Sequence, residues 1–444
     1  MNHRTLTFAF IFVSLSITAL NAQVTLPPPA ETTAPGGPIF QIHANSVLVP
    51  VVVRDAQSHA VGDLKQEDFK IFDQGKRRTI VGFTLQQSVK TEASPSAPPA
   101  STSVAPNSAP AAANPAQSST TTKRSIVFLF DDRHLGPGDL EQVKKAGIRM
   151  LEKPLADGDR AVVLSFRGVN SGITHDHVPL QTAISNLKPQ QINQRDRSQC
   201  PDIDYYTADQ ILNKHSKTEW DVAYEQAANC SHKSYGAGPS GGTGYVEQLV
   251  RTAANQALLA GDQDVRETLI YLRDVVHTMT KFPGQRTLIL VSPGFYTGTD
   301  EALAMQSSVL NVAAASNVVI SVLDARGLGG SNVGAGSNGS VSVFANMTGQ
   351  PIQSQLESAR ANEYLMSELA DGTGGTYFRH SNDLEGGLES LAAGPEFLYL
   401  LEFSLQDVKA NSSYHQLKVE VAGSGLSVKT RAGYFAPSPP GKNQ

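Results

Sequence analysis

Two adjacent carboxylates follow a continuous run of apolar residues, and their position suggests a binding site. Residues 125–130 read SIVFLF, and Asp131, Asp132, Arg133 and His134 come next, before a Gly-Pro-Gly turn. A buried parallel strand has such an unbroken apolar run, and ligands of open α/β sheets bind outside the carboxyl ends of the strands. We therefore expect these four side chains to lie at a ligand-binding edge, with Arg133 neutralising one of the carboxylates.

A second polar stretch contains histidines that could bind a metal with these carboxylates. His175, Asp176 and His177 follow a predicted strand at 161–166, and we expect them beside the end of strand 125–130. Imidazole and carboxylate ligands suit Zn²⁺, Cu²⁺ or Ni²⁺ better than Mg²⁺. The candidate metal ligands are Asp131, His134, His175 and His177, with Asp132 and Asp176 nearby. This metal site is the alternative interpretation; we expect a solvated polar edge without a metal or other cofactor, because alternate residues of an extended segment point to opposite faces.

Three further polar residues belong to the same predicted edge. Ser292 ends the apolar run 287–292, Asp324 ends the run 318–324, and Arg326 follows two residues later. A salt bridge or a helix cap is the expected role of Asp324 and Arg326. No predicted strand is followed by a Gly-x-Ser-x-Gly nucleophile elbow, and the chain contains no His-Glu-x-x-His motif. We therefore expect a binding protein without catalytic residues.

The order of the predicted elements indicates an α/β domain over residues 124–392. Alternating strands and helices favour a mainly parallel sheet with helices on both faces. The predicted strands are 125–130, 161–166, 287–292 and 318–324, and the predicted helices are 139–155, 245–281, 300–316, 365–372 and 383–392. Residues 190–243 and 327–350 are polar and rich in glycine, and we expect loops there that decorate the rim of the sheet.

Strand patterns also occur on both sides of this domain, in residues 39–88 and 393–436. The predicted strands are 47–53, 69–72, 79–84, 396–405, 414–423 and 426–435. The N-terminal group has too few strands to form a stable sheet alone, and chain ends commonly lie close together. We therefore expect one β-sandwich, built from both groups, that flanks the α/β domain. Residues 89–123 are rich in Ala, Ser, Pro and Thr and are expected to form a flexible linker, and 437–444 a tail.

The N-terminal residues 1–22 have the pattern of a secretory signal peptide. A basic start precedes an apolar run from Leu6 to Leu20, and Ala22 is the expected cleavage position, before a Pro-rich spacer at 23–38. The alternative is an uncleaved anchor, although the run is shorter than the ~20 residues of a spanning helix. We expect a mature chain without a membrane span in the periplasm or outside the cell.

The cysteine content indicates the redox compartment of the protein, and the net charge limits the classes of partner. Cys200 and Cys230 are the two cysteines of the 444 residues, and an exported protein meets an oxidising compartment, so we expect a disulfide rather than two buried thiols. The formal net charge of -5 offers no general attraction to nucleic acid or to an anionic membrane.

Several motifs together resemble a von Willebrand factor type A (VWA) domain. They are SIVFLFDD, LILVSPGF (288–295), VLDARGL (322–328) and LADGTGGTYF (369–378). The segment from VPVVVRD to RRTIVGF (49–83) and the closing FLYLLEF and KTRAGYF are more narrowly similar to the secreted VWA-related proteins typical of Acidobacteria. The resemblance covers about residues 45–436 and implies a Rossmann-like fold.

The resemblance also implies protein binding, in VWA domains through a metal-ion-dependent adhesion site. That site has an Asp-x-Ser-x-Ser motif, a threonine and a second aspartate, and only Asp131 fits the pattern. The other positions carry Arg133, Leu135, His177 or Val178, and Pro293, and neither a guanidinium nor an apolar side chain can ligate Mg²⁺. We therefore expect a degenerate adhesion site.

The expected function is that of an exported protein-interaction or cell-envelope scaffold module. Its contact surface would be the rim formed by residues 131–138, 170–180, 190–243 and 327–350, because loops on a rigid scaffold are where recognition usually occurs. The alternative is an envelope metal-binding or hydrolytic protein that uses the Asp/His cluster.

Overall fold

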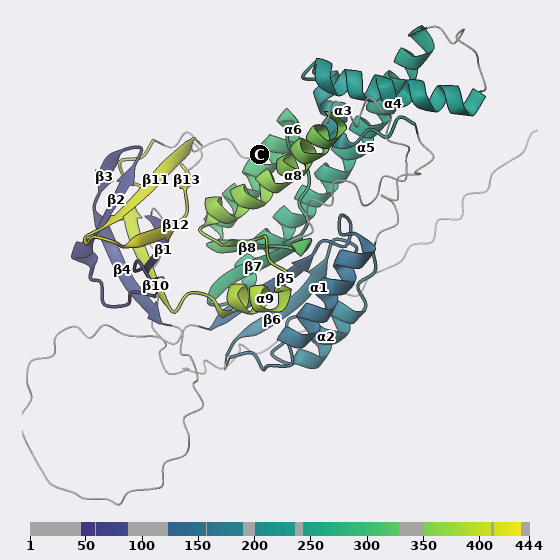
Figure 1. Ribbon diagram of the computed structural model, residues 1–444. Coiled ribbons are helices and arrows are strands. Elements are labelled where there is room, and N and C mark those ends of the chain that lie inside the picture. The colour runs from purple at the N-terminus through teal and green to yellow at the C-terminus, as the bar shows by residue number, and fades with distance from the viewer. Residues whose placement is uncertain are drawn as a thin grey trace, which may run out of the picture. The chain divides into compact units, whose positions relative to one another are not determined.

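The computed structural model describes residues 46–57, 59–87, 123–156, 158–189, 200–235, 243–327, 350–409 and 413–436 (Figure 1). The predicted signal peptide, the Pro-rich spacer, the tail, and nearly all of the linker 89–123 and of the loop 327–350 lie outside the described residues. No helix of the described part is long and apolar enough to cross a membrane.

Five strands form a parallel sheet, as the alternating pattern predicted. They are β5 (Arg124–Phe130), β6 (Arg160–Ser165), β7 (Gln285–Ser292), β8 (Val318–Asp324) and β9 (Tyr377–Phe378). Their order is β6-β5-β7-β8-β9, and all four pairings are parallel. The chain therefore moves to one side of the sheet after β5 and to the other side after β7, and a crevice for a ligand arises where the direction changes.

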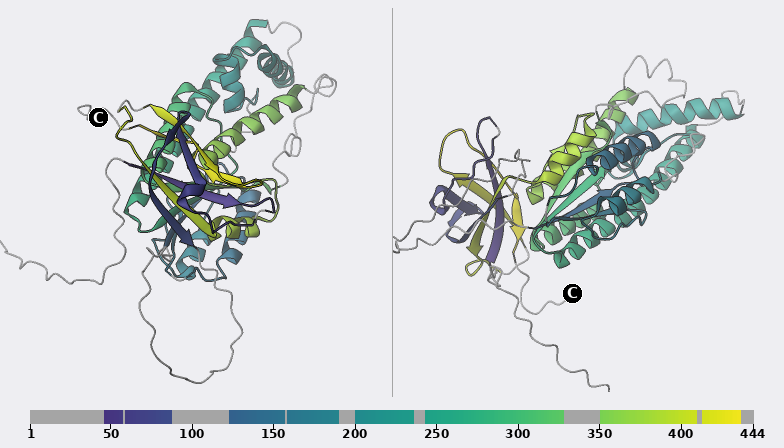
Figure 2. Two further views of the ribbon diagram at one scale, coloured as in Figure 1. Left: turned by 90° about the vertical axis from the view of Figure 1, so that its left-hand side faces the viewer. Right: turned by 90° about the horizontal axis from the view of Figure 1, so that it is seen from below.

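Helices cover both faces of this sheet (Figures 1 and 2). One face packs on α1 (Pro137–Met150), α2 (His177–Ser185) and α9 (Leu384–Ala393). The other face packs on α5 (Thr243–Thr278), α6 (Asp300–Ala315) and α8 (Gln350–Thr373). Successive strand residues point to opposite faces, so that Val127 and Leu129 enter one core while Ile126 and Phe128 enter the other.

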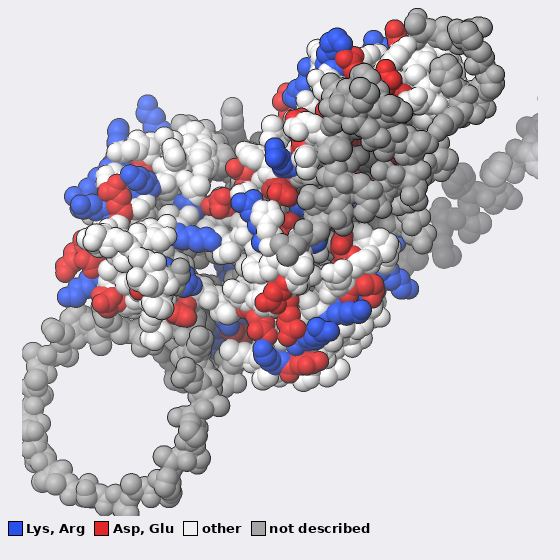
Figure 3. Space-filling view, viewed as in Figure 1, with Lys and Arg blue, Asp and Glu red and all other residues white. Residues whose placement is uncertain are grey.

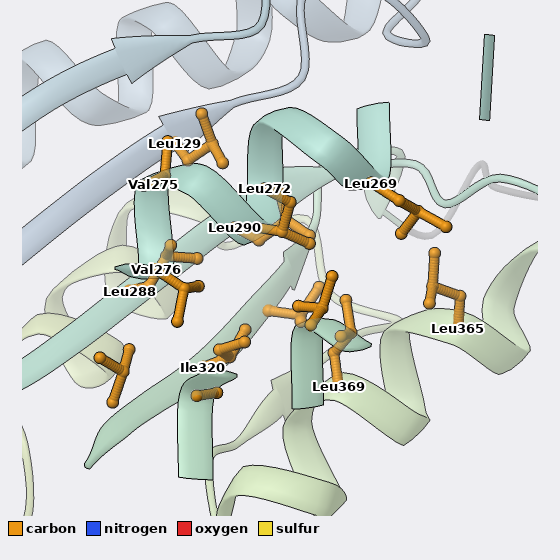
Figure 4. Packing of buried hydrophobic residues seen from close by; sticks show 14 of the residues in the cluster. Leu129, Leu269, Leu272, Val275, Val276, Leu288, Leu290, Ile320, Leu365 and Leu369 are labelled. Atoms are coloured by element: carbon orange, nitrogen blue, oxygen red, sulfur yellow. The ribbon is translucent and has the colours of Figure 1, made fainter. Parts of the chain in front are cut away.

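The core under α5 and α8 is built from branched aliphatic side chains. Leu269 and Leu272 of α5 and Leu365 of α8 lie around Leu290 and Ile320 of the sheet (Figure 4), and all five are at most 1% exposed. This packing fixes α5 and α8 on the sheet.

Two four-stranded antiparallel sheets share a separate core and form the expected sandwich. Their orders are β12-β1-β10-β4 and β13-β11-β2-β3. The strands are β1 (Ser46–Arg54), β2 (Phe69–Asp73), β3 (Lys76–Arg78), β4 (Ile80–Gln87), β10 (Phe397–Ser404), β11 (Tyr414–Val421), β12 (Ser427–Thr430) and β13 (Gly433–Phe435). Each sheet combines strands from both ends of the chain. They alternate in the first sheet, where β1 pairs with β10 and β12, whereas in the second sheet they meet once, where β2 pairs with β11.

The prediction that residues 190–243 form loops is wrong for its described part. That part contains α3 (Tyr205–Leu212) and α4 (Lys217–Tyr235), which pack with the first half of α5 around a core of their own. Much of this core consists of alanines, which carry little hydrophobic signal in a sequence: Ala208, Ala223, Ala227 and Ala254. The expected disulfide between Cys200 and Cys230 is confirmed, with a Cα–Cα distance of 6.1 Å.

Two helices differ in length from their predictions. The helix predicted at 139–155 ends with Met150, shortly before Pro154, because a proline disfavours helical backbone in the preceding residue. The helix predicted at 365–372 is the end of the 24-residue helix α8. Short 3-10 turns occupy Gln66–Asp68 and Met279–Lys281.

Positive and negative side chains alternate over the visible surface around α1, α2 and α9 (Figure 3). Two ion pairs connect α9 to α1 and to the residues that follow it. Arg149 of α1 pairs with Glu385, and Lys153 pairs with Glu389. This face therefore has no single sign of charge that would attract a polyanion.

Candidate functional site

The candidate site begins at the sheet's change of direction, between the carboxyl ends of β5 and β7. Asp131 follows β5 directly, and Ser292 is the last residue of β7. The Ser292 hydroxyl donates to Asp131 Oδ2 over 2.6 Å and accepts from the Gly294 backbone N–H at 3.0 Å. Asp131 and Ser292 are both 0% exposed, so this bond ties the two strand ends together inside the protein.

Gly294 allows this tight exit from β7. Its φ of +85° is the left-handed region that favours glycine, and a Cβ atom there would lie 2.4 Å from the carbonyl oxygen of Asn362 in α8. Ser292, Pro293 and Gly294 therefore form a tight exit from β7.

His134 lies between two carboxylates. Its Nδ1 is 2.8 Å from each Asp131 carboxyl oxygen, and its Nε2 is 2.6 Å from Asp264 Oδ2 of α5. The imidazole ring also stacks on Phe295, with ring centroids 4.9 Å apart. A carboxylate accepts hydrogen bonds only, so a ring that donates from both nitrogens satisfies both partners, and that ring is the imidazolium.

Charge and burial act on His134 in opposite directions. Burial alone would lower the pKa of His134, but the carboxylates of Asp131 and Asp264 outweigh burial and raise it to about 10. Burial raises the pKa of Asp264, whereas His134 and Arg133 lower it more, and the net result is a lowered pKa. At neutral pH, then, the chain itself supplies a cation beside Asp131.

Arg133 does not neutralise Asp131 or Asp132 as expected. Its guanidinium binds Asp264 Oδ1 at 2.6 Å and Glu267 Oε2 at 3.0 Å, both on α5. The backbone turn after β5 aims successive side chains in different directions, so His134 takes the place next to Asp131 while Arg133 reaches across to the helix.

Asp132 points to the other side, toward the end of β6. Its Oδ1 accepts from the Arg167 backbone N–H at 3.2 Å, and its side chain is 1% exposed. Burial raises the pKa of Asp132, and hydrogen bonds from Ser165 and Arg167 oppose that rise. The two adjacent carboxylates therefore diverge and do not form a paired acid/base site.

Asp324 and Arg326 form the expected salt bridge at the end of β8. Arg326 binds both oxygens of Asp324, at 2.9 and 2.7 Å, and reaches Glu363 of α8 at 2.8 Å. Burial lowers the pKa of Arg326, but these carboxylates raise it overall. Arg326 thus joins the sheet edge to α8 in the way that Arg133 and His134 join it to α5.

The expectation that His175, Asp176 and His177 lie beside the end of β5 is corrected by the backbone. After β6 the chain turns and runs back along that strand, with Asn170 bridged to Leu164 and Thr174 bridged to Ala161. Residues 175–177 therefore lie near the start of β6, away from the predicted rim, whereas Asn170 stays near the end of β6.

The pairing register of β5 and β6 gives the distance of residues 175–177 from Asp131. Ala161 pairs with Ile126, four residues before Phe130 of β5, so the three residues lie more than about 13 Å along the strands from Asp131. All three are exposed, and Asp176 caps α2 by accepting from the Val178 backbone N–H. The expected convergence of His175 and His177 with Asp131 and His134 is thus not found. Across the described ranges, no group of three His, Cys, Asp or Glu side chains is arranged to hold a metal ion.

A cavity of about 940 Å³ adjoins His134 and Asp264. Its walls come from the start of α3, the alanine-rich face of α5, the β7 exit and α8. Tyr205, Tyr206, Tyr296, Asp204 and Arg326 contribute the aromatic and charged parts of the lining. Gly261 of α5 lets Tyr205 lie against the helix, since a Cβ atom would come within 2.1 Å of its ring.

The sequence analysis missed Asp264, Glu267, Glu363 and the three tyrosines. These residues are far in the sequence from the side chains that they contact: Asp264, for example, is 130 positions away from His134. One signal existed: Asp264 interrupts a helical face whose neighbours Val265, Thr268 and Leu269 are all buried. A carboxylate on the buried face of a helix calls for a cationic partner.

No protein-family model matches this chain. Comparison with curated proteins also finds no match.

Proposed function

We propose that this chain is an exported, VWA-related protein-binding module whose sheet edge carries an internal imidazolium in place of an adhesion-site metal. The observation that carries the proposal is the Asp131–His134–Asp264 arrangement at the change of direction between β5 and β7. The arrangement neutralises the buried Asp131 without a bound ion. The rim around this arrangement consists of the start of α1 together with α3 and α8, and it offers a partner a rigid surface.

Two features support export and interaction. The Cys200–Cys230 disulfide fits an oxidising compartment, and the residues 1–22 have the pattern of a signal peptide. The metal-binding or hydrolytic alternative keeps only one of its three histidines, His134, because His175 and His177 lie at the opposite edge of the sheet. The Ser292 hydroxyl donates to Asp131 rather than to an imidazole base, so it is not arranged as an activated nucleophile.

Site-specific photo-crosslinking tests the proposal. A benzoylphenylalanine at Gly138, at the start of α1, has free space, since a Cβ atom there meets nothing within 4 Å. The matched control is the same group at Val178, which is 55% exposed and lies at the opposite edge. The intact mature chain, from Gln23, would be presented to the envelope and secreted fractions of its source.

The expected result is a discrete crosslinked partner from position 138 and none from position 178, unchanged by a chelator. Equal crosslinking from both positions would contradict a rim-specific surface. A partner that disappears with the chelator would contradict the internal cation, because partner binding would then depend on a metal.

A further inference from the structure

The cavity next to His134 has an aromatic wall made of three tyrosines. Tyr296 meets Tyr205 and Tyr206 edge-on, with ring centroids 5.5 and 5.3 Å apart and interplanar angles of 73° and 85°. All three rings are half-buried and line the cavity. Aromatic faces of this kind bind aliphatic chains by contact and cations by their quadrupole.

Each tyrosine hydroxyl points to a carboxylate behind the wall. Tyr205 donates to Asp262 at 2.6 Å, and Tyr296 donates to Asp209 at 2.7 Å. Tyr206 reaches Glu357 at 3.5 Å, a weaker contact. Burial, assisted by these carboxylates, raises the pKa of all three tyrosines, that of Tyr206 to about 12, so the rings stay neutral donors.

Carboxylates at and behind the cavity wall outnumber the nearby cations. Asp204 lines the cavity itself, and the carboxylates behind it are those that the three tyrosine hydroxyls reach, together with Glu219 near Asp204. The five carboxylates without a basic partner among the described residues are Asp204, Asp209, Glu219, Asp262 and Glu357. Asp209 is 0% exposed and Glu219 is 3% exposed. The nearby cations His134 and Arg326 are each already bound to two carboxylates. A buried carboxylate without a counterion is costly, so an incoming cation would be stabilised here.

We propose that this cavity, on the protein-binding rim of the proposed function, receives a lysine or arginine side chain from an extended segment of the partner. The three tyrosines contact the aliphatic stem and face the charge, and Asp204 lies at the cavity wall to pair with it. The inference rests on the proposed function and adds the chemistry that the partner must present.

The size of the cavity favours a side chain on a peptide over a metal ion. A volume of about 940 Å³ lies at the upper end of the range for small-molecule sites and far exceeds a hydrated ion. Over the described part of the chain, these acids form no group of three that could hold a metal.

Peptide binding to the intact mature chain tests the inference. The probes are five pentapeptides, Gly-Ser-Xaa-Ser-Gly with a neutral fluorophore, in which Xaa is arginine, lysine, citrulline, norleucine or glutamate. Fluorescence anisotropy should show the arginine and lysine peptides binding at least about tenfold more tightly than the citrulline and norleucine peptides. The difference should shrink as sodium chloride rises from about 50 to about 500 mM, because salt screens the attraction.

A matched pair of variants assigns the binding to this cavity. Asp204→Asn removes a charge but keeps a good helix cap for α3, where Asp204 accepts from the Thr207 backbone N–H. Asp176→Asn makes the same change at the cap of α2 on the opposite edge. Asp204→Asn should lower the affinity for the arginine peptide at least about fivefold, whereas Asp176→Asn should leave this affinity unchanged. Both variants should unfold near the wild-type temperature. Tyr206→Leu should weaken binding and Tyr206→Phe should preserve it, because the ring carries the contact.

Equal binding of arginine and citrulline peptides, preferred binding of the glutamate peptide, or insensitivity to Asp204→Asn would overturn the inference. Binding of free spermidine without binding of any peptide would assign the cavity to a small polyamine and overturn it as well. If no peptide binds but position 138 still crosslinks a partner, the inference fails and the proposed function stands. If no peptide binds and position 138 crosslinks no partner, the inference and the proposed function are both refuted.

Discussion

Replacing His134 with glutamine should destabilise the fold strongly, because it removes the cation between two carboxylates. The His134 side chain is 11% exposed and that of Asp131 0%, so water cannot replace the lost charge. Removal of one partner of a buried ion pair costs about 3–5 kcal/mol. Glutamine can still donate one hydrogen bond, so we expect a loss of about 3 kcal/mol in the free energy of unfolding at pH 7.

The same variant should also change how stability depends on pH. The pKa of His134 rises from its ordinary value of 6.5 in the unfolded chain to about 10 in the fold. Between these values the folded chain binds more protons than the unfolded chain, so the contribution of His134 is complete below about pH 6.5 and is lost as pH rises through about 10. The slope is up to about 1.4 kcal/mol per pH unit.

Urea unfolding at pH 7, 8 and 9 measures this effect. The difference between wild type and His134→Gln should shrink by about 2 kcal/mol over this range, because only the wild type loses the histidine contribution. The control is His175→Gln, an exposed histidine at the opposite edge, which should match wild type at each pH. A constant difference between wild type and His134→Gln from pH 7 to 9 would refute the imidazolium and indicate a neutral ring.

Three further changes test the framework around the site. Cys200→Ser should cost about 3–4 kcal/mol in urea unfolding, since it opens a loop of 30 residues, and wild type under reducing conditions should lose as much. Gly294→Ala should cost more than about 1 kcal/mol, because its φ is +85° and the new methyl group meets a backbone carbonyl; the exposed Gly138→Ala is the neutral comparison. Leu269→Ala should cost about 2–5 kcal/mol by leaving a cavity under α5, whereas Leu259→Ala, at a side chain 71% exposed, should cost little.

The parallel sheet was predictable because its strands are buried on both faces. The apolar run 318–324 became β8 without a shift, and 125–130 differs from β5 by one residue. The helices α3 and α4 were not predictable in the same way. Half of the buried residues in their core are alanines, which give a weaker apolar stripe than leucine or isoleucine and so distinguish a helix less clearly from a polar loop.

The position of the site was predictable, but its pairings were not. A carboxylate after an apolar run lies at the carboxyl edge of a sheet wherever the run becomes a parallel strand, and Asp131 does so. The choice of His134 over Arg133 as its partner depends on how the turn aims each side chain. After β6 the chain runs back along the strand, which places His175 away from Asp131. Backbone hydrogen bonds between Thr174 and Ala161 hold this segment, and a pattern of side-chain types does not predict such bonds.

The internal cation and the cavity lead to one joint prediction. His134 and Asp264 both line the cavity, so His134→Gln removes a positive charge from its wall while Asp264 keeps Arg133 as a partner. One unit charge at about 10 Å interacts by roughly 1–2 kcal/mol at an effective dielectric constant of 20. The arginine peptide should therefore bind His134→Gln about tenfold more tightly than wild type at low salt, although the variant is less stable. Weaker binding by a variant that is still folded would show instead that the imidazolium positions the cavity wall, and that charge does not govern recognition there.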